Sequence, residues 1–298
     1  NATFTEVESG GYRIATFVNN GAGTGTCTWT APNNVPTAEI MLVGGGGAGG
    51  YSAGGGGGGG ALVLHSSRSI SGAATVTVGR GGAPSTTSSP WSATKGGDGV
   101  ASSFADVIGT ISAAGGTGGN GCDWTGSVCF QNGNSNSGGA GGVATGGTIN
   151  LNGGAGGHGY RQTAGANPTS GASGNASQTR GTNTRYGGGG GGAGNNATPG
   201  AGVDGGASGT STSALPADAR QSSGGGGAGG NSSARGSSGG SGIVVIKYAI
   251  PFATNSPDVS IGFTYSGTNS MTSQGTIKRQ YATYADGACG TSWTSDTT

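Results

Sequence analysis

The glycine run at residues 44–60, GGGGAGGYSAGGGGGGG, constrains the fold more than any other stretch of this chain. Thirteen of its seventeen residues are glycine, yet apolar segments flank it on both sides, AEIMLV (38–43) before it and ALVLH (61–65) after it. Glycine loses more conformational freedom on folding than any other residue, so such a run is either a slack linker or a structure that only glycine can form. Because strand-like segments enclose the run, we expect the second.

The same bias extends over much of the chain. Of 298 residues, 75 are glycine, only 31% are hydrophobic and 8% are charged, whereas an ordinary globular domain has about 7% glycine and about 25% charged residues. Between residues 115 and 242, short glycine blocks alternate with polar inserts, and hydrophobic residues almost vanish. A hydrophobic core cannot order this segment, so backbone hydrogen bonds must do so.

Glycine can meet this demand as polyglycine II, an extended left-handed helix with three residues per turn and a rise of ~3.1 Å per residue. The helix has no internal hydrogen bonds, but without Cβ atoms several copies can pack side by side and bond to one another. The run 54–60 would span roughly 22 Å at this rise. We expect a polyglycine bundle over about 44–60 and 115–242, with a loose coil around a small β-core as the alternative. Glycines that should not tolerate a side chain include Gly44, Gly47, Gly54, Gly57, Gly60, Gly189 and Gly226.

The remaining segments favour β-structure and almost no α-helix. No 3.6-residue periodicity is sustained, whereas alternating or continuous apolar runs are frequent. The predicted fold class is all-β plus irregular, with a small β-sandwich-like core and packed polyglycine II helices. We expect one glycine-rich domain, 1–248, and a β-rich tail, 249–298, that forms hairpins or exchanges strands between copies. Residues 1–43 look like β-structure, and the main strand regions are about 11–82 and 241–248. The strand-like segments are 11–18, 27–32, 38–43, 61–65, 73–82, 102–116 and 241–250.

The four cysteines favour an oxidising, extracellular setting, and the start at Asn1 without a signal peptide fits a mature or processed chain. Cys122 and Cys129 enclose the short loop CDWTGSVC, where a local disulfide is plausible. Cys27 and Cys289 lie near the two ends and can pair with each other or with neighbouring subunits. Three pairings are possible, and the spacing does not choose among them.

Motifs that carry catalytic or cofactor chemistry are missing or weak. The segment GSSGG (236–240) matches the G-x-S-x-G pattern of hydrolases, but such matches are expected by chance in a Gly/Ser-rich tract, and neither His65 nor His158 has the context of a base. The stretch GGNGCDWT (118–125) resembles a single copy of a calcium-binding repeat that needs tandem copies. We therefore expect no enzyme activity, no cofactor and no metal site.

Charge and hydropathy exclude two classes of partner. The formal net charge is only +1, from 12 basic and 11 acidic residues, so no basic footprint for nucleic acid is visible. No apolar run approaches the ~20 residues of a membrane-spanning helix.

Aromatic residues in the polar inserts are candidates for surface recognition. Aromatic faces beside amides and hydroxyls suit binding to a glycan or to a protein, and they equally suit packing of the loops onto the domain or onto a neighbouring subunit. The candidate surface-binding aromatics are Trp91, Trp124, Tyr160 and Tyr186.

The order of motifs resembles a known family. A strand ending in LVGGGG (42–47), the turn GGGGGGGALVL (54–64), TVTVGRGG (75–82), GGDGVASSF (96–104) and GGSGIVVIKY (239–248) are similar to the glycine-rich domain of phage tail-fibre adhesins and secreted bacterial surface proteins. The resemblance covers about residues 11–248. It implies a non-enzymatic, exported or virion-surface module, whose polyglycine sandwich in the adhesins displays loops that bind the host surface.

Two functions remain open at this stage. The first is an extracellular structural protein, a self-assembling subunit of a surface filament or fibre that forms homo-oligomers through its C-terminal tail. The second is a receptor-binding adhesin of the phage tail-fibre type, which recognises a cell-surface glycan or protein through loops at 123–137 and 160–186.

Overall fold

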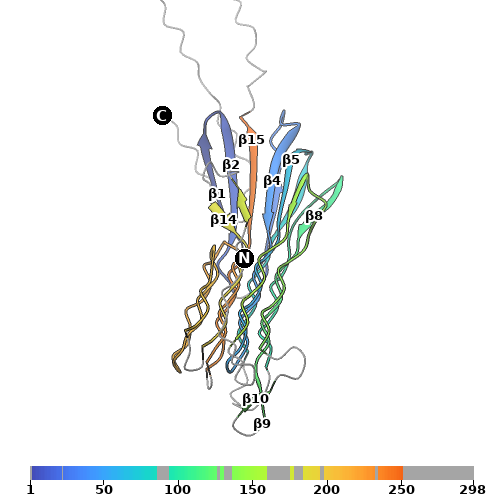
Figure 1. Ribbon diagram of the computed structural model, residues 1–298. Coiled ribbons are helices and arrows are strands. Elements are labelled where there is room, and N and C mark those ends of the chain that lie inside the picture. Colours follow the sequence, from blue (N-terminus) through green and yellow to red (C-terminus); the bar gives the residue numbers. More distant parts are fainter. Residues whose placement is uncertain are drawn as a thin grey trace, which may run out of the picture.

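The computed structural model describes residues 2–21, 23–85, 94–125, 128–130, 136–159, 175–177, 184–194, 198–231 and 234–250, with only the backbone of 123–125, 128–130 and 175–177. A sandwich of β-sheets forms one end of the molecule, and a bundle of extended glycine-rich chains forms the other (Figure 1). Within these residues there is no α-helix.

The larger sheet has six strands, in the order β1-β2-β15-β4-β5-β12, and every neighbouring pair is antiparallel. The C-terminal strand β15 therefore lies in the middle of the sheet, between two strands from the first 43 residues. The strands are β1 (Ala2–Ser9), β2 (Tyr12–Asn19), β4 (Thr37–Val43), β5 (Leu62–Ser69), β12 (Ile149–Leu151) and β15 (Ile243–Ala249).

The smaller sheet has five antiparallel strands, in the order β11-β8-β7-β6-β3. Two separate hairpins complete the strands described here: β9 (Asp123–Thr125) pairs with β10 (Val128–Phe130), and β13 (Asn175–Ser177) pairs with β14 (Thr184–Tyr186). The strands of the smaller sheet are β3 (Gly25–Thr30), β6 (Ala73–Val78), β7 (Ser102–Asp106), β8 (Gly109–Ala113) and β11 (Ala144–Thr145).

The core lies between the two sheets because each strand places alternate side chains on its inner face. In β3 the burial alternates strictly, with Cys27 and Trp29 inside and the threonines between them outside. The Trp29 ring centroid lies 6.2 Å from that of Phe104 and 5.9 Å from that of Tyr248, so it joins both sheets. The outer face of the larger sheet carries a second buried cluster that includes Met41, Val43, Leu62, Ile243 and Val245.

The predicted fold class is confirmed: the protein is all-β with a sandwich-like core. The apolar runs of the sequence correspond to the long strands β2, β4, β5 and β15. The six short strands β9 to β14 were not predicted, because they lie inside the glycine-rich segment and have no sustained apolar pattern of their own. β11 and β12 pair with the edges of longer strands, β8 and β5, and it is this pairing that keeps them extended.

Candidate functional site

The glycine segments hydrogen-bond with a period of three, which is the signature of polyglycine II packing. In the segment 44–52, each N–H donates in rotation to one of three neighbouring segments, 55–61, 94–100 and 234–240, so every third residue faces the same neighbour. The nine donors from Gly44 to Ser52 donate, in chain order, to the carbonyl oxygens of Ala61, Val100, Gly240, Gly58, Gly97, Ser237, Gly55, Thr94 and Ala234, at N···O distances of 2.8–3.2 Å.

The carbonyl groups of the same segment complete a sixfold shell. They accept from three further segments: Gly116 and Gly119 donate to Gly45 and Ala48, Gly227 donates to Gly47, and Gly82 donates to Gly46. The segment 54–61 is likewise bonded to six neighbours, which are 44–50, 114–120, 139–142, 154–157, 190–193 and 224–230. Both segments therefore have a hexagonal environment made almost wholly of backbone, with parallel and antiparallel neighbours.

Only glycine fits at the glycine positions of these two segments. A Cβ atom built on Gly57 would lie 2.1 Å from the carbonyl oxygen of Gly47, whereas real Cβ contacts essentially never fall below 3.0 Å. The same holds for all seven glycines singled out from the sequence, where the added Cβ would lie 1.9–2.3 Å from a backbone oxygen: Gly44, Gly47, Gly54, Gly57, Gly60, Gly189 and Gly226.

The turn between the two central segments is formed by Tyr51, Ser52 and Ala53. Ser52 (φ 54°) and Ala53 (φ 50°) are both in the left-handed region, although neither is glycine. All three are buried. A turn this tight lets the chain reverse within the hexagonal array.

The outer segments carry rows of side chains that the sequence analysis did not recognise. In 137–143 and 152–158, non-glycine residues recur at every third position and are exposed or half-buried, whereas the glycines between them are buried or half-buried. The period follows directly from three residues per turn. The repeats SGGAGGV (137–143) and NGGAGGHG (152–159) contain this signal. The exposed members of these two rows are Ala140, Val143, Asn152, Ala155 and His158.

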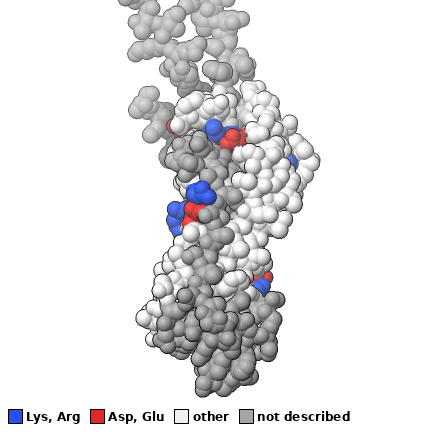
Figure 2. All heavy atoms as spheres, in the orientation of Figure 1, with Lys and Arg blue, Asp and Glu red and all other residues white. Residues whose placement is uncertain are grey.

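Side chains of other segments at the margin of the bundle, at residues 95–98 and 117, bond to neighbouring groups. The Thr117 hydroxyl accepts from the N–H of Ala140 at 2.7 Å, and Asp98 Oδ1 accepts from the N–H of Gly118 at 2.7 Å and from Lys95 Nζ at 2.7 Å. Burial alone would raise the pKa of Asp98, but these two hydrogen bonds and the Lys95 charge outweigh it and lower the pKa. On the face that Figure 2 shows, the few charged side chains gather in small clusters of both signs.

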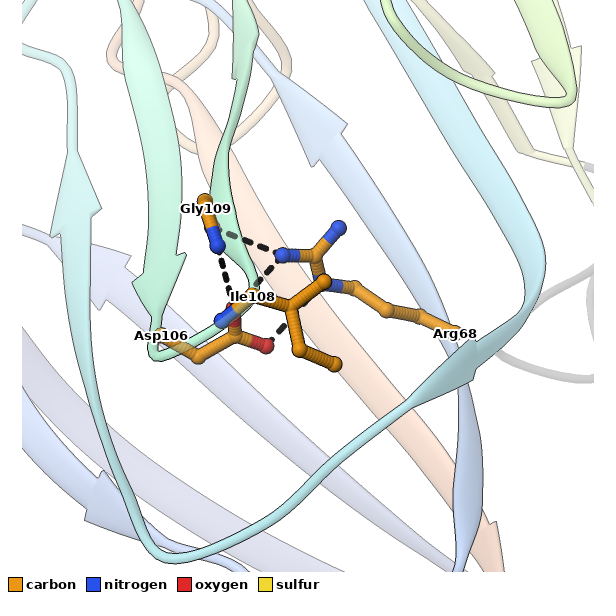
Figure 3. Close-up of polar contacts among 4 residues, drawn as sticks. All are labelled: Arg68, Asp106, Ile108 and Gly109. Atoms are coloured by element: carbon orange, nitrogen blue, oxygen red, sulfur yellow. Dashed lines mark hydrogen bonds and ion pairs between the residues drawn. The ribbon is translucent and has the colours of Figure 1, made fainter.

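At the sandwich end, a buried ion pair supports the exposed tip of the β7–β8 hairpin (Figure 3). Arg68 donates from Nε to Asp106 Oδ2 (3.0 Å), and from Nη2 to Asp106 Oδ1 (2.6 Å) and to the carbonyl of Gly109 (2.7 Å). Asp106 Oδ1 also accepts from the N–H groups of Ile108 (3.0 Å) and Gly109 (3.1 Å). The tip residue Val107 is 80% exposed. No sequence motif indicates this pair, whose partners lie 38 residues apart.

A second polar cluster closes the sandwich beside β1. The Tyr248 hydroxyl donates to Glu6 Oε1 at 2.6 Å, and Arg13 pairs with Glu6 (3.7 Å) and Glu8 (3.0 Å). Burial, together with the hydrogen bond to the Glu6 carboxylate, raises the pKa of Tyr248, so this phenol stays protonated as a donor. The cluster is structural, because Arg13 pairs with both Glu6 and Glu8, and Glu6 also accepts from the Tyr248 hydroxyl.

The aromatic candidates divide into three cases. The prediction that Tyr186 is a surface-binding residue is wrong: it is only 2% exposed and packs in the cluster with Met41 and Ile243 on the outer face of the larger sheet. A large aromatic ring at the end of β14 is more stable against that apolar face than in water. The backbone of Trp124 lies in β9, at the end of the bundle remote from the sandwich (Figure 1). Trp91 and Tyr160 lie outside the described residues.

Ser238 and His158, which were considered for chemistry, take part in hydrogen bonds within the bundle. Ser238 of the GSSGG match lies in an extended glycine segment and not in a strand-to-helix turn, and its N–H donates to Asp218 Oδ1 at 2.8 Å. His158 Nδ1 accepts from the N–H of Gly138 at 3.4 Å. Across the described ranges, no three His, Cys, Asp or Glu residues come together as a metal site, and no helix is long and apolar enough to cross a membrane.

The cysteine positions are compatible with the local pairing. Cys27 and Cys122 are buried, and neither of these two described cysteines is a free thiol. In the β9–β10 hairpin, Cys129 pairs with Trp124 through the backbone, which brings it diagonally across from Cys122. The side chain of Cys129 and the whole of Cys289 lie outside the described residues, so the pairing stays a prediction.

This pairing can be tested by peptide mapping. We expect a Cys122–Cys129 link in proteolytic fragments of the non-reduced protein, found by mass spectrometry. A bridge over so short a loop contributes about 2–3 kcal/mol by the chain-entropy relation. Fragments that join Cys122 to Cys27 or Cys289 instead would contradict the prediction.

The comparison with known families agrees with this architecture. The model of a glycine-rich domain matches residues 21–249, which is more than half of the chain. The protein belongs to this glycine-rich domain family. The match starts shortly before β3 and ends with β15, so it takes in most of both sheets and the whole bundle. No curated protein matches the sequence.

Proposed function

We propose that this glycine-rich domain protein is an extracellular, non-enzymatic structural subunit that assembles into a filament or fibre on a surface. The observation that carries the proposal is the bundle itself, an interior of hydrogen-bonded backbone that leaves no room for side chains and therefore none for a ligand pocket or a catalytic group. Such an interior makes the domain rigid and elongated, which are the properties that a filament subunit needs.

The position of the chain exit supports the same proposal. The last described residue, Ile250, lies at the sandwich end, beside the turn between β1 and β2, and its N–H donates to the carbonyl of Gly11 at 3.1 Å. The bundle extends from the opposite end of the sandwich (Figure 1). A segment of 48 residues, 251–298, thus follows the sandwich end of the molecule, from which it can reach the sandwich of a second copy.

Assembly of the purified protein tests the proposal. We expect light scattering to show mass that grows with concentration, and negative-stain electron microscopy to show elongated assemblies. Particles that remain monodisperse and monomeric at the highest soluble concentration would contradict a filament subunit. A measurement at several salt concentrations serves as a control, because an assembly made by backbone pairing should depend only weakly on salt, whereas nonspecific charge association is screened.

An adhesin remains the second candidate, and one observation favours it. The chain reverses repeatedly at the end of the bundle remote from the sandwich, where Tyr51–Ala53 turns and where the β9–β10 hairpin protrudes (Figure 1). Polyglycine segments that end together would there present several loops side by side. The test is to exchange residues 126–135 and 160–174 for unrelated sequences, so that the buried Tyr186 and the β13–β14 hairpin stay in place, and to measure binding to cells and glycans. An adhesin should change its specificity, whereas a filament subunit should assemble as before.

A further inference from the structure

The edge strand β1 of the larger sheet is long and regular. It pairs with β2 over eight residues in an unbroken register, from Ala2↔Asn19 to Ser9↔Tyr12. Its pairing has no bulge and its sequence, ATFTEVES, has no proline or lysine; of the usual devices that block an edge strand it has only an inward charge, Glu6, which Arg13 and the Tyr248 hydroxyl pair with. At the opposite edge of this sheet, β12 has only three residues. A long, regular edge offers a row of backbone groups to another strand.

The inward face of β1 is apolar and only partly covered at Ala2 and Phe4, whereas Glu6 further along the strand is already paired with Arg13 and Tyr248. Ala2 and Phe4 face inward but are only partly buried, and the Phe4 ring centroid lies 5.0 Å from that of Phe17. On the outer face, Thr3 and Thr5 are exposed, and Val7 is 56% exposed. The protein's own residues therefore leave β1 accessible, and one more apolar strand would cover the margin beside Phe4.

The C-terminal segment contains a strand that fits this edge. Residues 258–267, DVSIGFTYSG, alternate apolar and small polar residues, so that Val259, Ile261, Phe263 and Tyr265 share one face. The other candidate, 275–287, has Lys278 next to Arg279, which would direct one of the two charges toward the core in either register. The first segment is the one that can extend an apolar core.

We propose that residues 258–267 of a second copy add to the free edge of β1 and complete the core beside Phe4. This inference rests on the proposed function and names its interface. Strand addition draws its affinity from main-chain hydrogen bonds and its register from alternate side chains. Each copy provides one donor segment and one acceptor edge, so the contact is heterologous and repeats along an open chain.

The experiment uses two full-length variants, each with one defective half of the interface. Thr5→Pro disrupts the acceptor edge, and Ile261→Pro disrupts the donor segment, because proline removes a backbone donor and breaks strand pairing. We expect each variant alone to remain monomeric by light scattering. Mixed one to one, they should form dimers that grow no further, because only one intact donor and one intact acceptor can meet. The matched controls, Asn150→Pro on β12 and Ile277→Pro in the second tail segment, should assemble like wild type.

The outcomes separate the interface from the proposed function. If wild type assembles and Ile261→Pro assembles equally well, or if Ile277→Pro is the variant that stops assembly, the interface is wrong while the filament proposal stands. If wild type never assembles, both fail. A mixture that stays monomeric would mean that the tail pairs with its own β1, which also overturns the inference. If Thr5→Pro melts at a much lower temperature than wild type, its failure to assemble is not informative. The Ile261→Pro variant, which leaves the sandwich unchanged, then tests the interface by itself.

Discussion

Gly57→Val is expected to reduce the stability of the bundle severely. Gly57 lies in the middle of a central segment, donates to Gly227 at 2.7 Å and accepts from Gly190 at 2.9 Å. A Cβ there would lie 2.1 Å from the Gly47 oxygen and 2.5 Å from the Gly47 carbonyl carbon. Since both contacts are with backbone, no side chain can rotate away, and two segments must separate. Overpacking costs about 1–3 kcal/mol where side chains can adjust, so we expect a loss of about 3 kcal/mol or more.

The matched control is Ala155→Val, on an outer segment of the same bundle. Ala155 is exposed and belongs to the outward row between Asn152 and His158. The same side chain added there meets water, so a change within about 0.5 kcal/mol is expected. Chemical denaturation followed by circular dichroism gives both values. Equal stability of the two variants would mean that 54–60 behaves as a linker, contrary to its hydrogen bonds.

The strands of the sandwich could be predicted because their pattern is local. Burial in β3 and β6 alternates with period two, and the central strands β4 and β15 are continuous apolar runs, as expected where both faces are covered. The polyglycine bundle could be predicted from a shortage of side chains, because only backbone hydrogen bonds remain to order such a segment. In both cases the cause lies within a few neighbouring residues.

Other features could not be predicted because they depend on contacts between distant residues. Tyr186 has the sequence neighbours of a loop residue, and its burial comes from an apolar sheet face whose buried residues, such as Met41 and Ile243, lie 57 or more residues away in the sequence. The order of the segments in the hexagonal array is likewise invisible in any one run. The outward rows are the exception: the three-residue spacing in NGGAGGHG is local, and it identifies an outer segment, whereas uninterrupted glycine at 54–60 identifies a central one.

Asp106→Asn is the second substitution with a large expected effect. It removes the charge of a side chain that is 2% exposed and leaves Arg68, whose side chain is 9% exposed, without its counter-ion. Removing one partner of a buried ion pair costs about 3–5 kcal/mol, because the remaining charge stays desolvated. Asp98→Asn is the matched control, since the Lys95–Asp98 pair is about half exposed on both sides. A loss below about 1 kcal/mol is expected there.

The pH dependence separates loss of charge from loss of shape. Burial tends to raise the pKa of Asp106, but the hydrogen bonds and charge of Arg68, with the N–H groups of Ile108 and Gly109, outweigh it and hold the pKa below the usual 3.8. A carboxyl whose pKa is lowered in the folded state stabilises the fold above its unfolded value, and loses this contribution as pH falls through the folded value.

The free energies of unfolding of wild type and Asp106→Asn should therefore differ most above about pH 5 and converge below about pH 4. Urea titrations at several pH values measure this directly. Curves that stay parallel down to pH 3 would mean that the carboxylate contributes only as a hydrogen-bond acceptor, which asparagine replaces in part. Convergence would show that the charge of Asp106, and not only its hydrogen bonds, stabilises the β7–β8 turn.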